Sequence, residues 1–305
     1  MAISDALGEL RSLEIEDGRI EYRIGGEGQG PTVVFLHGII ANADVWREVV
    51  ADLASDHRCV APDWPFGAHR LGMRLGTDFS LPGLARMVER FLVAAGLDQV
   101  VLVANDTGGA VAQYVAAAHP QRIAALVLTP CDAFDNFPPL PIRHLRLFGR
   151  TPWGLWLLAQ VLRWHFVQRL PIAFGLLTER PIPAAIMRSY TGPLRDHAST
   201  RRDFAALVRQ INPRYTIDVA PRLASYRQPV LLAWARERRR FFPLDHAYRL
   251  AAIFPQARVE IIEDSGPFVT EDQPAIVAAS IRRFLTERVD RRGESKQGGR
   301  HDDRS

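Results

Sequence analysis

The residues best placed to do chemistry surround Asp106, in the segment VVLVANDTGGAVAQ. An apolar run typical of a strand buried on both faces leads into residues 104–109, and a helix of small residues follows. Small residues on both sides of a central side chain are typical of a nucleophile elbow, the tight strand-to-helix turn that presents that side chain above the end of a sheet. The turn would aim the Thr107 amide and the helix dipole at the same space. The alternative is an ordinary turn in which Asp106 only caps the helix.

The elements that must position Asp106 alternate along the chain. LEIEDGRIEYRIGG predicts a hairpin around Asp17-Gly18, because two alternating runs flank a strong two-residue turn signal. Apolar runs then alternate with helical patterns, from PTVVFLHG through CVAPDWP, VVLVAND, IAALVLTP and PVLLAWA to ARVEIIED. Strands that alternate with helices form a parallel sheet with right-handed crossovers. We therefore predict an α/β fold with a mostly parallel central sheet flanked by helices.

Residues 134–215 interrupt this alternation, because they contain no clear strand and are rich in Pro, Trp, Leu and Arg. We expect them to form a helical insertion, here called the insertion, that covers an apolar pocket as a cap. A helix that lies on a membrane surface is the alternative for the same residues. The predicted organisation is an α/β core at 1–133 and 216–289, a helical cap at 134–215 and a disordered polar tail at 290–305.

The composition is that of an ordinary globular protein, with 47% hydrophobic and 24% charged residues in a chain of 305. No apolar run reaches the roughly 18–20 residues that span a bilayer. The first residues, MAISDALGELRSLEIEDG, carry acids early and lack the apolar centre of a signal peptide, so we expect a cytoplasmic protein. The net charge of +4 comes from scattered arginines rather than a basic stripe, which argues against a nucleic-acid partner.

Two cysteines, Cys59 and Cys131, are too few for a disulfide framework, and both are expected to be buried thiols. No cluster of His, Cys and Asp has metal-ligand spacing, and GxGxxG and P-loop patterns are absent. We therefore expect no metal and no nucleotide cofactor. The sequence indicates no oligomeric state.

The motifs FLHG, APDWP, NDTGGA, LVLTP, FFPLDHA and FVTEDQP, in this order, resemble the α/β-hydrolase superfamily from about Leu13 to Val289. The most similar branch has an aspartate nucleophile and contains haloalkane dehalogenases and epoxide hydrolases. The resemblance implies that Asp106 attacks an sp³ carbon and forms an ester, which water activated by a histidine then hydrolyses. It also implies that the backbone amides of Ile39 and Thr107 form an oxyanion hole.

The chain departs from that pattern at the catalytic base and acid. Where the family usually has Gly-His-Phe, this chain has Gly266-Pro267-Phe268, and proline has no proton-transfer group. The usual acid position falls on Arg238 or Arg239, with Glu237 the only carboxylate nearby. Asp132, at the end of the strand before the insertion, is the alternative acid, unless it only bonds the local backbone.

We therefore predict Asp106 and Asp132 as catalytic residues, and no imidazole within about 3.2 Å of Asp106, the usual hydrogen-bond limit. Ser265, Asp132 and a histidine of the insertion are the candidates to fill the space left by the missing base. The histidines concerned are His144, His165 and His197, for each of which an ordinary surface or packing role is the alternative.

Substrate binding is expected at His37 and Gly38, beside the elbow, and at Tyr190 in the insertion. His37 itself is expected to be structural rather than a base. In the resembling family, dehalogenases hold halide with an Asn and a Trp at the positions of Ile39 and Thr107, so these two donors are missing. Tyr190 and Tyr215 are placed to protonate an epoxide oxygen, with plain packing as the alternative.

Three functions remain open from the sequence. The first is a hydrolase-like enzyme for a hydrophobic small molecule, with Asp106 as the nucleophile. The second is a lyase, isomerase or cyclase in which a buried Asp106 of raised pKa transfers protons. The third is a non-catalytic protein that binds a ligand in a former active site.

Overall fold

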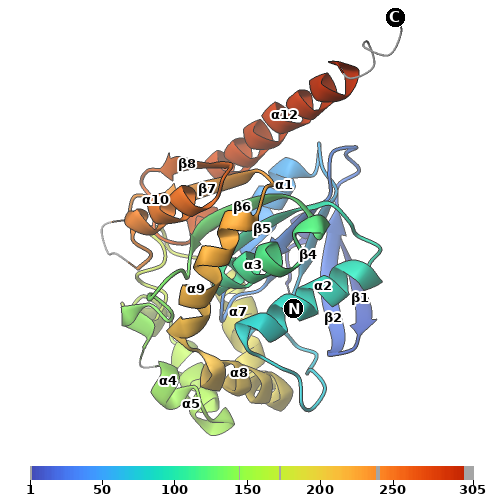
Figure 1. The fold of residues 1–305 in the computed structure, drawn as a ribbon. Coiled ribbons are helices and arrows are strands. Elements are labelled where there is room, and N and C mark those ends of the chain that lie inside the picture. The colour runs from blue at the N-terminus through green and yellow to red at the C-terminus, as the bar shows by residue number, and fades with distance from the viewer. Residues whose placement is uncertain (1, 144, 172, 238–240, 299–305) are drawn as a thin grey trace, which may run out of the picture.

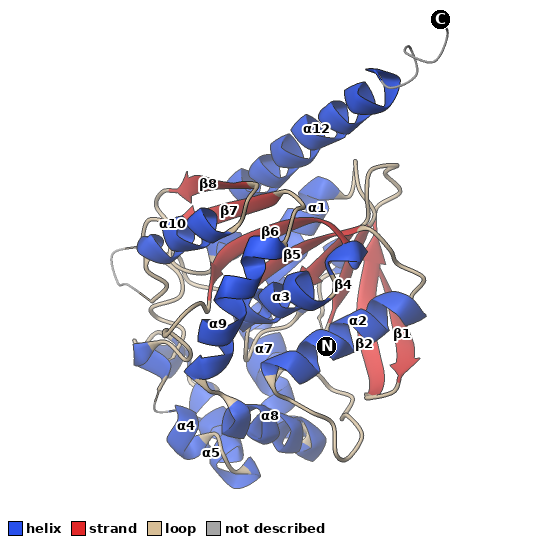
Figure 2. Ribbon diagram, viewed as in Figure 1, coloured by secondary structure: helices blue, strands red, loops and turns tan. Residues whose placement is uncertain are grey.

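An eight-stranded, mostly parallel sheet forms the centre of the molecule (Figure 2). The computed structural model describes residues 2–143, 145–171, 173–237 and 241–298. The strand order is β1-β2-β4-β3-β5-β6-β7-β8. The strands are β1 Glu9–Ile15, β2 Gly18–Gly25, β3 Val33–Leu36, β4 Cys59–Pro62, β5 Val100–Asp106, β6 Ile123–Cys131, β7 Val230–Ala235 and β8 Ala257–Ile262.

The sheet follows the predicted pattern. β1 and β2 form the antiparallel hairpin expected around Asp17-Gly18, with Ile15 paired to Gly18. β2 also pairs antiparallel with β4, and every later pair is parallel. All residues of β3 and β5 are buried, which explains their continuous apolar runs. Cys59 and Cys131 are free and buried, as predicted.

Helices cover both faces of the sheet (Figure 1). The helices α2, α3 and α10 lie on one face, and α1 and α12 lie on the other. The bounds are α1 Arg47–Leu53, α2 Leu81–Ala94, α3 Thr107–Ala118, α10 Leu244–Ile253, α11 Val269–Asp272 and α12 Pro274–Gly298. No helix in the described part of the chain is long and apolar enough to cross a membrane.

The insertion lies between β6 and β7, and its described residues contain helices and no strand. Its helices are α4 Leu145–Phe148, α5 Pro152–Leu162, α6 His165–Gln168, α7 Ala184–Asp196, α8 Ala198–Gln210 and α9 Pro213–Val219. In Figure 1, α4, α5 and α8 form the end of the molecule opposite to the projecting end of α12. The division of the chain into a core and a cap stays a prediction at the level of domains.

The C-terminal helix is longer than the sequence predicts. α12 continues to Gly298, so residues 290–298 are helical where we expected disorder, and residues 299–305 lie outside the described residues. Polarity misled the prediction: RRGESKQ is charged, but Arg, Glu, Lys and Gln are all good helix formers.

Candidate active site

Asp106 ends β5 in a strained backbone conformation. Its φ is 54° and its ψ is −133°, a region that residues other than glycine rarely adopt, and α3 begins at the next residue. Such strain persists only where surrounding structure imposes it, and it clusters at functional sites. The Asp106 carboxylate also accepts a hydrogen bond from the Thr107 amide, 2.5 Å from Oδ1. The turn is therefore an elbow, and Asp106 caps the helix at the same time.

Three glycines make the elbow sterically possible. A Cβ on Gly38 would lie 2.5 Å from the Cβ of Asp106. A Cβ on Gly108 would lie 2.4 Å from the His37 carbonyl oxygen, and one on Gly109 would lie 2.3 Å from the Cβ of Cys131. The small residues that flagged the motif in the sequence are thus required by the close approach of three chain segments.

A cavity of about 240 Å³ opens above Asp106. Among the residues that the structure describes, Asp106 is the only ionisable one that lines this cavity, and the insertion supplies most of the other walls. The Oδ2 atom of Asp106 receives no hydrogen bond from the described residues, whereas Oδ1 is held by Thr107. The lining residues are Ile39, Ile40, Asp106, Ile142, Leu145, Leu158, Val161, Leu162, Val167, Ala173, Phe174, Leu177 and Phe241.

The Thr107 hydroxyl joins Asp106 to Asp132. Its Oγ1 lies 3.1 Å from Oδ1 of Asp106 and 2.8 Å from Oδ2 of Asp132. Asp132 follows β6 and is buried, and its Oδ1 has no hydrogen-bond partner in the structure. One hydroxyl hydrogen serves only one carboxyl group, so both contacts are hydrogen bonds only if the other carboxyl group donates its own proton.

The two carboxyl groups hold protons unequally. Burial raises the pKa of Asp106 to about 6, against the opposing effect of its two hydrogen bonds from Thr107. Burial, and then the charge of Asp106, raises the pKa of Asp132 well above its ordinary value. Two carboxylates in contact repel, so one of them takes up a proton. Asp132, whose pKa is raised by burial and by the charge of Asp106, therefore favours its neutral form more strongly, and the Thr107 hydroxyl links it to Asp106.

The loop at Pro267 packs against the elbow through Asn105. The Asn105 side-chain amide donates to the Thr129 hydroxyl, to the Pro130 carbonyl at 3.0 Å and to the Pro267 carbonyl at 3.3 Å. The structure thus places the Pro267 carbonyl against the residue that precedes Asp106. We did not single out Asn105 in the sequence, although a polar amide at the end of a fully apolar strand is a usable signal.

No imidazole in the described part of the chain forms a hydrogen bond with Asp106. His144 lies outside the described residues. His165 lines a different hollow, and His197 stands between α7 and α8 as the residue that precedes α8. Ser265, the candidate on the Pro267 loop, directs its hydroxyl to the Gly266 carbonyl at 2.9 Å.

His37 is a structural residue, as expected, and does not line the cavity. Its Nε2 accepts from the Trp64 amide and its Nδ1 lies 2.8 Å from the Gly38 carbonyl, so both ring nitrogens are used within the protein. Burial lowers the pKa of His37 to about 3. Gly38 serves the site by leaving room for Asp106. Ile39 does line the cavity, but its amide forms no hydrogen bond with the carboxylate among the described residues.

Tyr190, the third expected substrate-binding residue, is not among the residues that line the cavity, although its ring stacks on that of Phe174, which does line it. Its hydroxyl donates a hydrogen bond to Glu271 at 2.8 Å. Both terminal nitrogens of Arg47 also donate hydrogen bonds to Glu271, at 2.7 Å. This buried cluster joins the insertion to the loop before α12. Contact between Tyr190 and Glu271 depends on the packing of segments far apart in the sequence, and a substrate-binding role for Tyr190 stays a prediction.

The remaining sequence candidates that the structure describes form no hydrogen bond with Asp106. Glu237 accepts from the Phe242 amide, while Arg238 and Arg239 lie outside the described residues. Tyr215 packs edge-on against Tyr114, and its backbone carbonyl accepts a hydrogen bond from the Tyr114 hydroxyl. Within the described residues, no group of three His, Cys, Asp or Glu side chains is placed to hold a metal ion.

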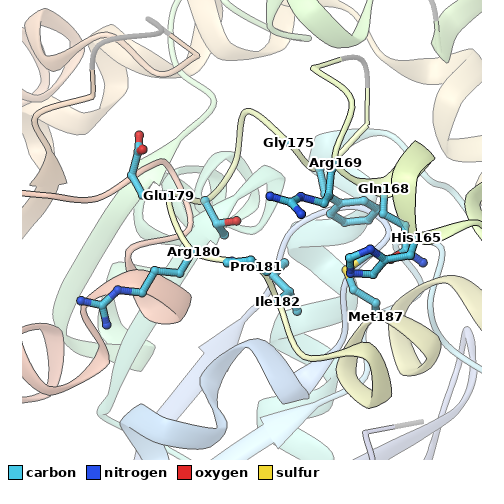
Figure 3. Close-up of a pocket in the computed structure, with 11 residues that line it drawn as sticks. His165, Gln168, Arg169, Gly175, Glu179, Arg180, Pro181, Ile182 and Met187 are labelled. Atoms are coloured by element: carbon cyan, nitrogen blue, oxygen red, sulfur yellow. The ribbon is translucent and has the colours of Figure 1, made fainter.

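A second hollow of about 230 Å³ lies within the insertion (Figure 3). Figure 3 shows the guanidinium of Arg169 reaching toward its middle, while the side chains of Glu179 and Arg180 point away. His165 and Gln168 line the same hollow, and Asp106 does not. Its polar walls contrast with the apolar cavity, so the cavity above Asp106 is the candidate active site.

Comparisons with known proteins agree with this fold. A family model described as alpha/beta hydrolase fold matches residues 31–274. Haloalkane dehalogenase 2 of Mycobacterium bovis is 29% identical over 284 residues, which cover 90% of this chain and 95% of that protein. A cis-3-alkyl-4-alkyloxetan-2-one decarboxylase of Shewanella oneidensis is 26% identical, with 86% of this chain and 84% of that protein covered. The solved structure of the epoxide hydrolase CorEH superposes with a TM-score of 0.76 at 21% identity, over 92% of this chain and 99% of that one.

Proposed function

The chain belongs to the α/β-hydrolase fold family and is similar to haloalkane dehalogenases, and on this basis we propose that it is an enzyme that attacks apolar small molecules through the Asp106 carboxylate. One observation carries the proposal: a strained elbow holds one carboxylate oxygen against a backbone amide and leaves the other unpaired at the floor of an apolar cavity. A side chain that only capped a helix would need neither the strain nor the cavity.

The proposed first step is a displacement at an sp³ carbon. Oδ2 of Asp106 forms a bond to that carbon, and the bond from the carbon to the leaving group breaks with its electron pair on the leaving group. Oδ1 then becomes the carbonyl oxygen of an alkyl ester, already hydrogen-bonded to the Thr107 amide. Attack of water on the ester carbon would place negative charge on this same oxygen, so the Thr107 amide acts as an oxyanion donor. Ile39 is the proposed second donor.

The missing base sets the expected rate of the second step. General-base assistance typically contributes about 10²–10⁴-fold, and Pro267 supplies none. The ester is therefore expected to accumulate, with hydrolysis as the slow step. We propose that the insertion acts as the cap of this site, since it supplies the apolar walls that select the substrate.

A second candidate function, proton transfer, is favoured by the link between the two carboxyl groups. An ionised Asp106 of pKa about 6 accepts a proton readily near neutral pH, and the Thr107 hydroxyl connects it to a protonated Asp132. In a lyase or isomerase reaction Asp106 would remove a proton from the substrate without forming a bond to carbon.

Mass spectrometry of the intact protein separates the two functions. The electrophiles are haloalkanes, epoxides and alkyl-substituted oxetan-2-ones, chosen because relatives are named for acting on compounds of these classes. Nucleophilic attack predicts a covalent adduct on the wild-type chain and none on Asp106→Asn. Asparagine tolerates the left-handed backbone at this position, so the variant keeps the elbow. Product without any adduct, lost in Asp106→Asn, would instead support proton transfer, and neither adduct nor product from the whole panel would refute both.

Replacing Pro267 with histidine is expected to shorten the lifetime of the ester. The Pro267 carbonyl already lies beside Asn105, so an imidazole at this position would stand next to the elbow. Decay of the adduct should accelerate about 10²-fold or more, the low end of general-base assistance. Pro267→Ala is the matched control, since it removes the ring without adding a base. An equal decay rate in both variants would contradict the view that the base alone is missing.

A further inference from the structure

Helices α5 and α6 and the residues between them expose several large apolar side chains within a short stretch of the sequence. We call Trp153, Trp156, Leu157, Val161, Trp164 and Phe166 the aromatic face. Trp153 is 70% exposed, Phe166 is 66% exposed and Trp164 is 57% exposed. Single exposed apolar residues are common, but a cluster of this size marks a surface that contacts something else.

Four members of the aromatic face lie on the outer side of α5, a helix that is apolar on both sides. Residues 153, 156, 157 and 161 recur at helical spacing, and the opposite side of α5 buries Leu155, Ala159 and Leu162. The inner side packs against α7 and α8. A helix that is apolar all round needs an apolar partner on each side, and α5 has a partner within the described chain on one side only. Its eleven residues are too few to span a bilayer.

The charged residues of the segment that carries the aromatic face are all basic. Residues 136–178 contain five arginines and no aspartate or glutamate. Within the described residues, none of these five arginines forms an ion pair, whereas arginines elsewhere on the surface, such as Arg86, Arg258 and Arg283, pair with carboxylates. The five are Arg143, Arg146, Arg150, Arg163 and Arg169. The surface therefore presents unneutralised positive charge next to aromatic rings.

We propose that the aromatic face docks on the surface of an anionic lipid bilayer. Tryptophan rings and arginines that flank an apolar helix face suit the membrane interface, where one end of the side chain is apolar and the other wet. A second copy of this chain fits less well, because a two-fold interface would place the basic surface against itself with no acid to neutralise it. The arginines thus favour a partner with an anionic surface, and the aromatic rings favour one with an apolar interior; an anionic lipid bilayer has both.

The docked orientation would place the substrate cavity near the lipid. Val161 belongs to the aromatic face, and it also lines the cavity above Asp106 together with its neighbours Leu158 and Leu162. Arg169, whose guanidinium reaches into the hollow of Figure 3, follows α6 on the same segment. Lipid binding itself does not depend on the proposed reaction of Asp106, so the two proposals fail independently.

Tryptophan fluorescence offers a direct test on the whole chain. Of the six tryptophans, Trp46, Trp64 and Trp234 are fully buried in the core, and the other three all belong to the aromatic face. Vesicles of phosphatidylcholine with 30 mol% phosphatidylglycerol, brominated in the acyl chains, should quench the three exposed rings. We expect a blue shift and quenching with these vesicles, and at least a tenfold weaker response with pure phosphatidylcholine, because arginines contribute most of the attraction.

Sedimentation with the same vesicles gives the quantitative comparison. The variant Trp153→Ser/Phe166→Ser should bind at least tenfold more weakly, with Leu75→Ser as the matched control, since Leu75 is 83% exposed outside the insertion. Arg163→Gln should weaken binding about fivefold, from the attraction of one arginine to an anionic membrane. Arg86→Gln, which removes an ion-paired arginine instead, should leave binding unchanged.

Several results would overturn the proposal. Binding equal on neutral and anionic vesicles would exclude the charge argument, and binding unchanged in Trp153→Ser/Phe166→Ser would exclude the aromatic face. Absence of binding to any vesicle would exclude lipid docking outright. A dimer in light scattering that Trp153→Ser/Phe166→Ser converts to a monomer, together with no vesicle binding, would assign the face to a second copy instead. Circular dichroism of each variant checks that the chain stays folded.

Discussion

Two regions of this molecule surround buried carboxylates with very different numbers of hydrogen-bond donors. At the junction between core and insertion, Asp272 accepts backbone amides from Glu179, Arg180 and Gly266 at 2.8–2.9 Å. Asp44 similarly receives two backbone amides and the Ser189 hydroxyl. At the elbow, Thr107 is the only one of the described residues that donates hydrogen bonds to Asp106.

Burial therefore does not distinguish the two regions, since Asp106 and Asp132 are as buried as Asp44 and Asp272. The number of donors does. A carboxylate with several hydrogen bonds is stabilised as an anion and holds structure together. One with few donors is a less stable anion, and its remaining oxygen is available to react. The predictions below change each region in the same way and compare the results.

The largest expected effect is the loss of chemistry in Asp106→Asn. Adduct formation and turnover should fall about 10³-fold or more, since the amide is not a nucleophile. The free energy of unfolding at pH 7 should rise, by up to about 3 kcal/mol, because the variant no longer buries a poorly solvated charge. Urea unfolding at pH 7 and mass spectrometry measure the two effects. A variant that lost stability along with activity would make Asp106 a structural residue.

The same substitution at Asp272 should act in the opposite direction. Asp272→Asn replaces one of the accepting oxygens with an amide that faces backbone N–H groups, which leaves buried donors unpaired. The free energy of unfolding should fall by about 3 kcal/mol, the cost of one or two unsatisfied buried donors. Activity per folded molecule should change little. Urea unfolding beside Asp106→Asn gives the comparison, and equal signs for the two variants would break it.

The pH dependence of stability should show the raised pKa of Asp106. An acid whose pKa is higher in the folded than in the unfolded state binds protons more tightly when folded. The free energy of unfolding of the protein therefore falls as pH rises from about 4 to about 6. Relative to Asp106→Asn, the free energy of unfolding of the wild-type chain should fall by up to about 3 kcal/mol across this window and should not fall further above it. Unfolding free energies of both proteins at pH 4, 5, 6 and 7 provide the test. A constant difference would mean that the pKa is not raised.

The smallest effect is expected at the second carboxyl group of the elbow. If Asp132 is protonated at neutral pH, Asp132→Asn keeps a neutral donor toward the Thr107 hydroxyl, and activity should change by no more than about fivefold, the energy of one hydrogen bond. Thr107→Val removes one of the bonds that lower the pKa of Asp106, so the pH at which activity is half-maximal should rise. A 100-fold loss in Asp132→Asn would instead show that its ionised form takes part in the reaction.

The sequence predicts the parts of this molecule that depend on local pattern. The hairpin at Asp17-Gly18, the buried strands and the elbow all arise from residues within a few positions of each other, and the structure contains each of them. The hydrogen bonds that define the site are different in kind. Asn105 reaches Pro267 across 162 positions and Asp132 meets Thr107 across 25, so no periodicity or motif specifies these contacts.

Two of the predicted site residues show the same dependence on packing. Tyr190 is a reasonable ligand for a substrate by residue type, but its hydroxyl is taken by Glu271, 81 positions away. His37 is a reasonable contact by position, but the Trp64 amide occupies its Nε2. In both cases a polar group suited to a substrate is already satisfied inside the protein, which becomes visible only once the chain is packed.

The contact between Gly38 and Asp106 restricts substitutions at the two positions to different extents. The nearest obstacle to a side chain at 38 is the Cβ of residue 106, an atom shared by aspartate, serine and cysteine. An exchange of nucleophile could therefore occur without any change at Gly38, whereas Gly38 could acquire a side chain only after residue 106 had lost its own. The nucleophile at this elbow can therefore change while the glycine is retained, so Gly38 is the more tightly constrained of the two positions.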